Sequence, residues 1–255
     1  MARSKSQRLN PLETSVFDRT DTGESTISPQ IYNLMIGLVL LYGFGVNYIM
    51  VQTIDPQVIA GINPWVFFGG YFASCLAGIY LFNTSSNPLV SFVGYNMVVV
   101  PFGLIVNLVV HQYDPELVQA AIRVTALVTM LMMTLGSIFP SFFEKIAGAL
   151  TLALLAVIVV EVVEIFIFGI HHGVIDWIVA GIFCGYIGYD WARANKIPYT
   201  LDNAVDSAAA LYMDIINLFL RILRIMGAEE VGTGLGPPYM GPCRFQHTDR
   251  ITCLE

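Results

Sequence analysis

The sequence predicts an all-α integral membrane protein with seven transmembrane helices. Two observations predict this class. Hydrophobic residues make up 56% of the 255 residues and charged residues only 12%, about half the roughly 25% usual in soluble domains. The apolar residues gather in long runs with short connections between them. Such a chain cannot cover a water-facing surface, so the bilayer is its solvent.

Seven apolar runs reach the roughly 20 residues that a helix needs to cross a bilayer. Pro101 lies inside the third run and predicts a kink there. Asp202 is the expected N-cap of the seventh run, and Gly227 is expected to end it. The short connections predict antiparallel neighbours in one bundle. The seven runs cover about 32–51, 64–82, 88–110, 117–139, 146–170, 174–191 and 204–226.

The domain organisation expected from this pattern is a polar tail over 1–30, a membrane domain over 31–227 and a tail over 228–255. The last part is rich in Gly and Pro and is expected to be disordered or an expression remnant. Basic residues of the first tail predict a cytoplasmic N-terminus. With seven spans, the C-terminus would then be external. Arg221 and Arg224 near the end of the last run argue against this, because basic residues favour the cytoplasmic side. The sequence does not decide between a bacterial inner membrane and a eukaryotic endomembrane.

Several function classes are disfavoured by composition and motifs. The net charge is −7 without a basic patch, which argues against nucleic acid as a partner. The last apolar run has no lysine, so a retinal Schiff base is excluded. Neither His-Glu-x-x-His nor Gly-x-Ser-x-Gly occurs, so no enzyme is expected. No cofactor is expected either.

Ionisable residues inside the apolar runs carry the functional signal. A charged side chain at the bilayer centre costs about 2.5–3.5 kcal/mol on insertion scales, so such residues are rarely incidental. The two basic residues in these positions are Arg123 and Arg221, and the acids outnumber them. An interior with this excess of acids suits cations or protons rather than anions. The acids are Glu161, Glu164, Asp190, Asp206 and Asp214.

Asp214 is the strongest single position. At helical spacing it shares one small and polar face with Ser207, Ala210, Asn217 and Arg221. This face is expected to turn toward a cavity or a partner helix. The alternative is a buried Asp that bonds Asn217 or a neighbouring Ser and only locks the bundle.

Asp190 and Asp214 lie on successive antiparallel runs and can face each other. Their distances from the connecting loop differ by up to roughly 10 Å at 1.5 Å per residue, so spacing permits the contact without requiring it. If they meet in a low dielectric, they share one proton. A divalent cation can replace that proton.

The remaining intramembrane residues leave two interpretations open. Glu161 and Glu164 are three residues apart. Either they line an ion path, or one of them pairs with Arg123 or bonds neighbouring polar side chains. Asp176 is most simply a first-turn acid of the sixth run.

Glycines thin one side of the sixth run. Gly181, Gly185 and Gly188 favour close approach to another helix, although glycine is also common in membrane helices.

The C-terminal third resembles the Bax-inhibitor family of membrane proteins. The resemblance rests on Tyr189-Asp190 and on the run from Ala210 to Gly227, LYMDIINLFLRILRIMG after its first residue. Weaker similarity extends it over about residues 30–227, at 32–35, 129–136 and 143–145.

The resemblance implies a fold of seven helices with the last one wrapped by the other six. It implies a pH-sensitive calcium leak channel, and suppression of cell death in eukaryotic members. Asp190 and Asp214 would be the proton-sensing latch and calcium-linked site. Bacterial relatives are expected to carry an arginine on the second helix, whereas this chain has no Lys or Arg between Arg19 and Arg123.

We therefore expect a calcium leak gated by Asp190 and Asp214, with Asp206, Asn217 and Arg123 as candidates for the surrounding network or pathway. Calcium would be the transported or regulatory ion. The expected partners are the lipid bilayer, calcium, protons and other membrane proteins. The alternative is a membrane scaffold or regulator of stress or cell death that transports nothing.

Overall fold

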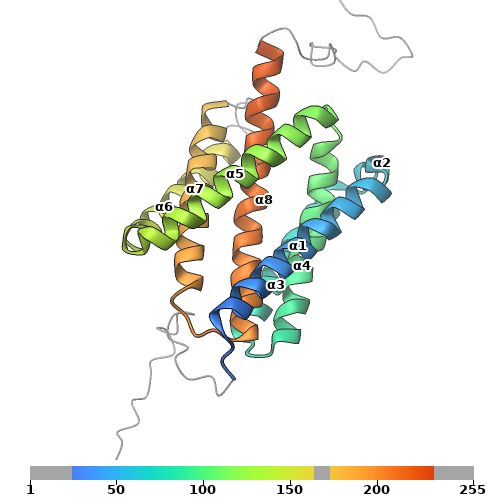
Figure 1. Ribbon diagram of the computed structural model, residues 1–255. Helices are drawn as coiled ribbons and strands as arrows, with labels where there is room; N and C mark the ends of the chain where they lie inside the picture. The colour runs from blue at the N-terminus through green and yellow to red at the C-terminus, as the bar shows by residue number, and fades with distance from the viewer. Residues whose placement is uncertain (1–24, 164–172, 233–255) are drawn as a thin grey trace, which may run out of the picture.

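The computed structural model describes residues 25–163 and 173–232, and these ranges form helices joined by short connections (Figure 1). The all-helical class is confirmed. The helices are α1 (Pro29–Thr53), α2 (Pro56–Ala60), α3 (Pro64–Thr84), α4 (Pro88–Val110), α5 (Pro115–Ile138), α6 (Pro140–Val163), α7 (Gly173–Ala194) and α8 (Leu201–Gly232).

Proline starts each of the first six helices. Its fixed φ suits the first turn, where its missing N–H costs no hydrogen bond. At α1, α2, α3 and α4 the preceding Ser, Asp or Asn caps the helix, as when the Asn63 side chain accepts a hydrogen bond from the Trp65 N–H at 3.0 Å. These Ser-Pro, Asp-Pro and Asn-Pro pairs set the helix starts.

The predicted runs correspond to the seven long helices, with three corrections. The helix of the fifth predicted run is α6, and it begins at Pro140, six residues before the predicted start. The charged residues Glu144 and Lys145 belong to the helix and do not precede it. Gly227 does not end α8, which continues to Gly232. The cap of α8 is Thr200, whose Oγ1 accepts a bond from the Asn203 N–H at 3.1 Å.

Five helices, α1 and α3 to α6, are long and apolar enough to cross a membrane. The two long helices outside this group, α7 and α8, carry most of the buried charges. A helix enclosed by other helices does not need an apolar surface all round, since lipid does not reach it. The prediction of seven spans stays a prediction.

Helix α8 lies between two groups of helices (Figure 1). It packs against α1 and α4 on one side and against α5 and α7 on the other. Leu211, Tyr212 and Leu223 on α8 are fully buried, and the Tyr212 ring packs on Tyr95 and Phe102 of α4. Helix α3 packs mainly on α4, and α6 mainly on α7. Enclosure of α8 by all six others therefore stays a prediction.

Glycine allows α5, α6 and α7 to approach one another closely near the end of α7. A Cβ atom on Gly188 would overlap the Phe143 ring of α6, and a Cβ atom on Gly136 of α5 would overlap the Gly188 backbone. The predicted close approach is right for Gly188 and Gly185. It is wrong for Gly181, which faces open space.

Candidate functional site

The side chains of Asp190 on α7 and Asp214 on α8 lie within hydrogen-bonding reach of each other. The Asp190 side chain is 12% exposed, and Asp214 is 7% exposed. Two ionised carboxylates have only acceptor atoms, so a hydrogen bond between them requires a proton on one of them. The Oδ2 atom of Asp214 is buried and has no hydrogen-bond partner among the described residues.

The connection between the two helices brings these residues to the same level. Asp190 lies four residues before α7 ends, and Asp214 lies thirteen residues after α8 begins. Helix α8 must therefore start about 13 Å farther out than α7 ends, at 1.5 Å per residue. Six extended residues can span about 20 Å, and the linker 195–200 has that length. It is held beside α1 by the bond from the Ile27 N–H to the Tyr199 carbonyl.

Arg193 supplies positive charge beside the pair. Its Nη1 atom lies 3.8 Å from Oδ1 of Asp190, one turn earlier on the same helix. The second predicted helix, α3, carries no basic residue. Arg193 was not among the site residues predicted from the sequence, although its spacing of three residues from Asp190 places the two on one helix face.

The first turns of α8 form a second polar region, which joins α8 to α1 and α4. Asp206 is 6% exposed and interacts electrostatically with the hydroxyl of Tyr32 on α1. That hydroxyl lies 3.0 Å from the Ser207 hydroxyl. Asp202 was predicted to cap the helix, but it instead accepts a hydrogen bond of 2.7 Å from the Ser91 hydroxyl of α4. Asp206 is thus buried beside α1 and not beside Asp214.

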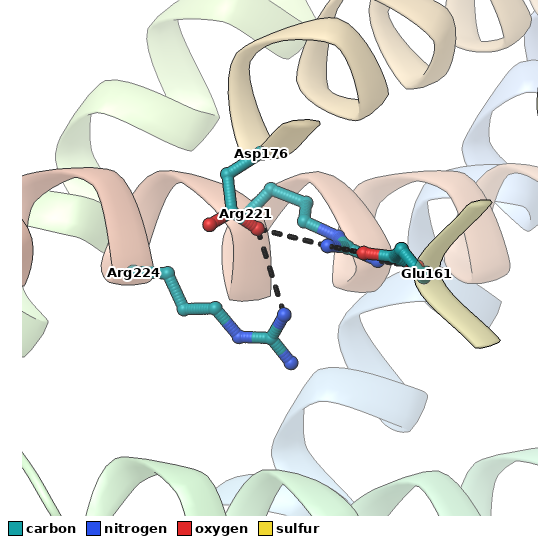
Figure 2. Close-up of polar contacts among 4 residues, drawn as sticks. All are labelled: Glu161, Asp176, Arg221 and Arg224. Carbon is teal, nitrogen blue, oxygen red and sulfur yellow. Dashed lines mark hydrogen bonds and ion pairs between the residues drawn. The ribbon is translucent and has the colours of Figure 1, made fainter. Parts of the chain in front are cut away.

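Figure 2 shows a third group, in which Arg221 and Arg224 of α8 meet acids of two other helices. Arg221 grips Glu161 of α6 in two parallel contacts, of 2.5 and 3.0 Å. It also donates to Asp176 of α7 at 2.8 Å, and Arg224 lies 3.5 Å from the same oxygen. We call these four residues the arginine cluster.

The arginine cluster corrects one interpretation of the sequence and extends another. Arg123 was considered as the ion-pair partner of Glu161, but it is exposed on α5. Arg221 is the partner instead. Asp176 does lie in the first turn of α7, but its side chain is only 5% exposed and binds two arginines. Glu164 lies outside the described residues, so an ion path through it stays a prediction.

The polar face predicted around Asp214 is divided among different partners. Ser207 faces α1, Asp214 faces α7 and Arg221 reaches α6. Asn217 donates to the Met213 carbonyl of its own helix at 2.7 Å. Asn217 therefore does not supply the bond considered for Asp214, whose carboxyl group lies beside Asp190.

No group of three or more His, Cys, Asp or Glu side chains within the described ranges is arranged to hold a metal ion. Calcium prefers six to eight oxygen ligands. The Asp190–Asp214 pair supplies two carboxyl groups, so water and backbone would have to provide the other ligands. Calcium binding by this pair stays a prediction.

The profile of the family described as inhibitor of apoptosis-promoting Bax1 matches residues 25–231. The chain belongs to the Bax inhibitor-1 family. It is 26% identical over 232 residues to an uncharacterized membrane protein of Streptococcus pyogenes serotype M1, which covers 84% of this chain and 98% of the relative. Protein LIFEGUARD 4 of Arabidopsis thaliana is 51% identical over 49 residues, 19% of either chain. A BI1-like protein of the same plant is 51% identical over 45 residues, 18% of this chain and 17% of the relative.

This Bax inhibitor family chain is a multi-pass integral membrane protein, as predicted. Its buried aspartates lie on the two helices that pack most closely together, α7 and α8.

Proposed function

We propose that this protein is a pH-sensitive cation leak pathway, that calcium is the ion it carries, and that Asp190 and Asp214 gate it. The observation that carries the proposal is the close approach of two largely buried carboxyl groups on neighbouring helices. A contact between two acids inside a membrane bundle is stable only while it holds a proton. Its geometry therefore depends on pH, unlike that of an ordinary ion pair.

The protonated pair ties α7 to α8. Loss of the proton leaves two negative charges in contact at low dielectric, and they repel each other. The carboxyl groups then separate and release α8, which lies between the two helix groups. Arg193 beside Asp190 stabilises a negative charge on Asp190, so the shared proton belongs with Asp214.

The direction of the pH response follows from this exchange. The closed state holds a proton that the open state releases, so acid favours closure and rising pH favours opening. The two separated carboxylates then attract cations, and divalent ions most strongly.

Calcium flux into liposomes across pH tests the proposal. The wild-type flux is expected to rise with pH. In Asp214→Asn the carboxamide still donates a hydrogen bond to Asp190 at every pH, so flux is expected to stay low and independent of pH. Asp190→Asn is expected to lose the wild-type pH response. Asp202→Asn is the matched control, because it removes a buried acid of the same helix away from the pair. Unchanged pH dependence in both pair variants would remove these residues from the mechanism.

A membrane regulator without transport is the second candidate. The family's description as an inhibitor of apoptosis-promoting Bax1 favours it. It predicts a stable complex with another membrane protein and no calcium flux by the purified chain at any pH. The same liposome assay therefore separates the two functions.

A further inference from the structure

The arginine cluster lies on the same three-helix side of the protein as the aspartate pair, but farther along α8. Arg221 follows Asp214 by seven residues, about 10 Å along the helix. Its side chain is 16% exposed, and those of Glu161 and Asp176 are 17% and 5% exposed. An arginine bound by two acids from two other helices is thus largely enclosed (Figure 2).

We propose that Arg221 is a tethered blocking cation: held by Glu161 and Asp176, it closes the cation pathway at the end opposite the first turns of α8. This role rests on the proposed leak function. It adds a second closing element that depends on a charge fixed to the protein, whereas the aspartate pair depends on a proton.

The contact distances show why the guanidinium occupies a cation position. Its Nη1 atom is 2.5 Å from a Glu161 oxygen and 2.8 Å from an Asp176 oxygen, so these oxygens are at most 5.3 Å apart. Calcium binds oxygen at about 2.3–2.6 Å, so it can bridge two oxygens up to about 5.2 Å apart. Nη1 thus lies where a bridging ion would lie.

The charges around Arg221 support the same role. Arg224, the other base of the cluster, is 40% exposed and lies 3.5 Å from Asp176. Without Arg221, the Glu161 carboxylate would lose both of its contacts with a guanidinium. A buried carboxylate without a partner is costly, so another cation would be drawn into the space.

The position of Arg221 on α8 links the two closing elements. Helix α6 packs mainly on α7, and the Arg221–Glu161 ion pair joins it to α8. A movement of α8 after the aspartates separate would carry Arg221 with it. Because the grip on Glu161 is bidentate and therefore sensitive to direction, such a movement would weaken it.

The test compares Arg221→Gln, Arg221→Lys and Glu161→Gln in liposomes at acidic pH, where the aspartate pair is closed. Arg221→Gln is expected to raise calcium flux severalfold. Arg221→Lys keeps the tethered charge and is expected to remain nearly closed. Glu161→Gln leaves Arg221 on Asp176 and is also expected to remain nearly closed. If the ion pair were merely structural, Glu161→Gln and Arg221→Gln would have equal effects, and this result would overturn the proposal.

Calcium binding to the purified variants in detergent, measured by isothermal titration calorimetry, gives a readout that does not depend on transport. Arg221→Gln is expected to gain one binding site relative to wild type, and the double variant Glu161→Gln with Arg221→Gln is expected to lose it again. No gain in Arg221→Gln would overturn the proposal even if the aspartate gate holds. If Arg221→Gln does not fold, the double variant replaces it in the flux assay, since it removes one acid together with the base. Its acidic flux is expected to exceed that of Glu161→Gln, from which it differs only at Arg221, and equal flux would count against the blocking role.

Discussion

The aspartate pair and the arginine cluster join the same two helices, α7 and α8, but they balance charge in different ways. In the arginine cluster both acids contact a guanidinium, and Asp176 contacts two. In the aspartate pair the acids contact each other, and Arg193 stands 3.8 Å from one of them. One site contains opposite charges, and the other contains like groups that need a proton.

This difference divides α8 into two functional halves. Arginine stays protonated at any physiological pH, so the cluster keeps its charges throughout. The pair can change its charge when one proton leaves. A single helix thus carries one contact that responds to pH and another that responds only to movement or to competing cations.

Arg221→Met is expected to have the largest effect on stability. It leaves two buried carboxylates short of a partner, and breaking a buried ion pair in this way costs about 3–5 kcal/mol. Thermal unfolding of the purified protein in detergent measures the loss. A loss no greater than that of Asp214→Asn would show that the two sites do not differ as described.

Gly188→Val is expected to destabilise the protein by about 1–3 kcal/mol through overpacking. The new side chain would meet the Phe143 ring. Because position 188 lies two residues before Asp190, the aspartate pair should be disturbed more than the arginine cluster. The readout is the melting temperature together with the pH response of flux. Gly181→Val, which enters open space on the same helix, is the matched control and should leave both nearly unchanged.

The pH dependence of stability sharpens the comparison further. Because the closed pair holds one proton that the unfolded chain releases, wild-type stability should fall with rising pH, by up to about 1.4 kcal/mol per pH unit. Asp214→Asn should lack this slope, and Glu161→Gln should retain it. Melting temperatures across a pH series in detergent give the slopes, and equal slopes in wild type and Asp214→Asn would contradict the shared proton.

Lys196→Ala should have the smallest effect. Lys196 forms an ion pair with Glu144 near the end of α7, and both side chains are 42% exposed. Exposed pairs contribute about 0–1 kcal/mol, so the melting temperature should barely change. A loss as large as that of Arg221→Met would show that burial does not separate the two kinds of ion pair.

The sequence predicted the long helices well because their signals are local. Prolines after capping residues mark the starts, and apolar length marks the extent. The five-residue helix α2 was missed because it is too short to give an apolar run. The end of α8 was misplaced because Gly227 suits a helix stop, whereas the helix packs onward there, with Gly227 against Tyr113.

The site was predictable only in part, because its contacts join distant segments. The two acids of the pair were identified from burial cost and helical position, but their common level depends on the path of the linker 195–200. Glu161 and Arg221 are 60 residues apart. Sequence spacing alone made Arg123 an equally good candidate for the ion-pair partner of Glu161. Which arginine reaches an acid depends on how the helices pack, and no local pattern records that.

The proton shared by Asp190 and Asp214 can be observed directly by infrared difference spectroscopy, since a protonated carboxyl group absorbs apart from a carboxylate. Spectra of the purified protein across pH should contain one protonated carboxyl band that disappears as pH rises. The band should be absent in Asp214→Asn and should respond to pH differently in Asp190→Asn. A wild-type spectrum without such a band, or one that neither variant changes, would contradict the shared proton and with it the gate.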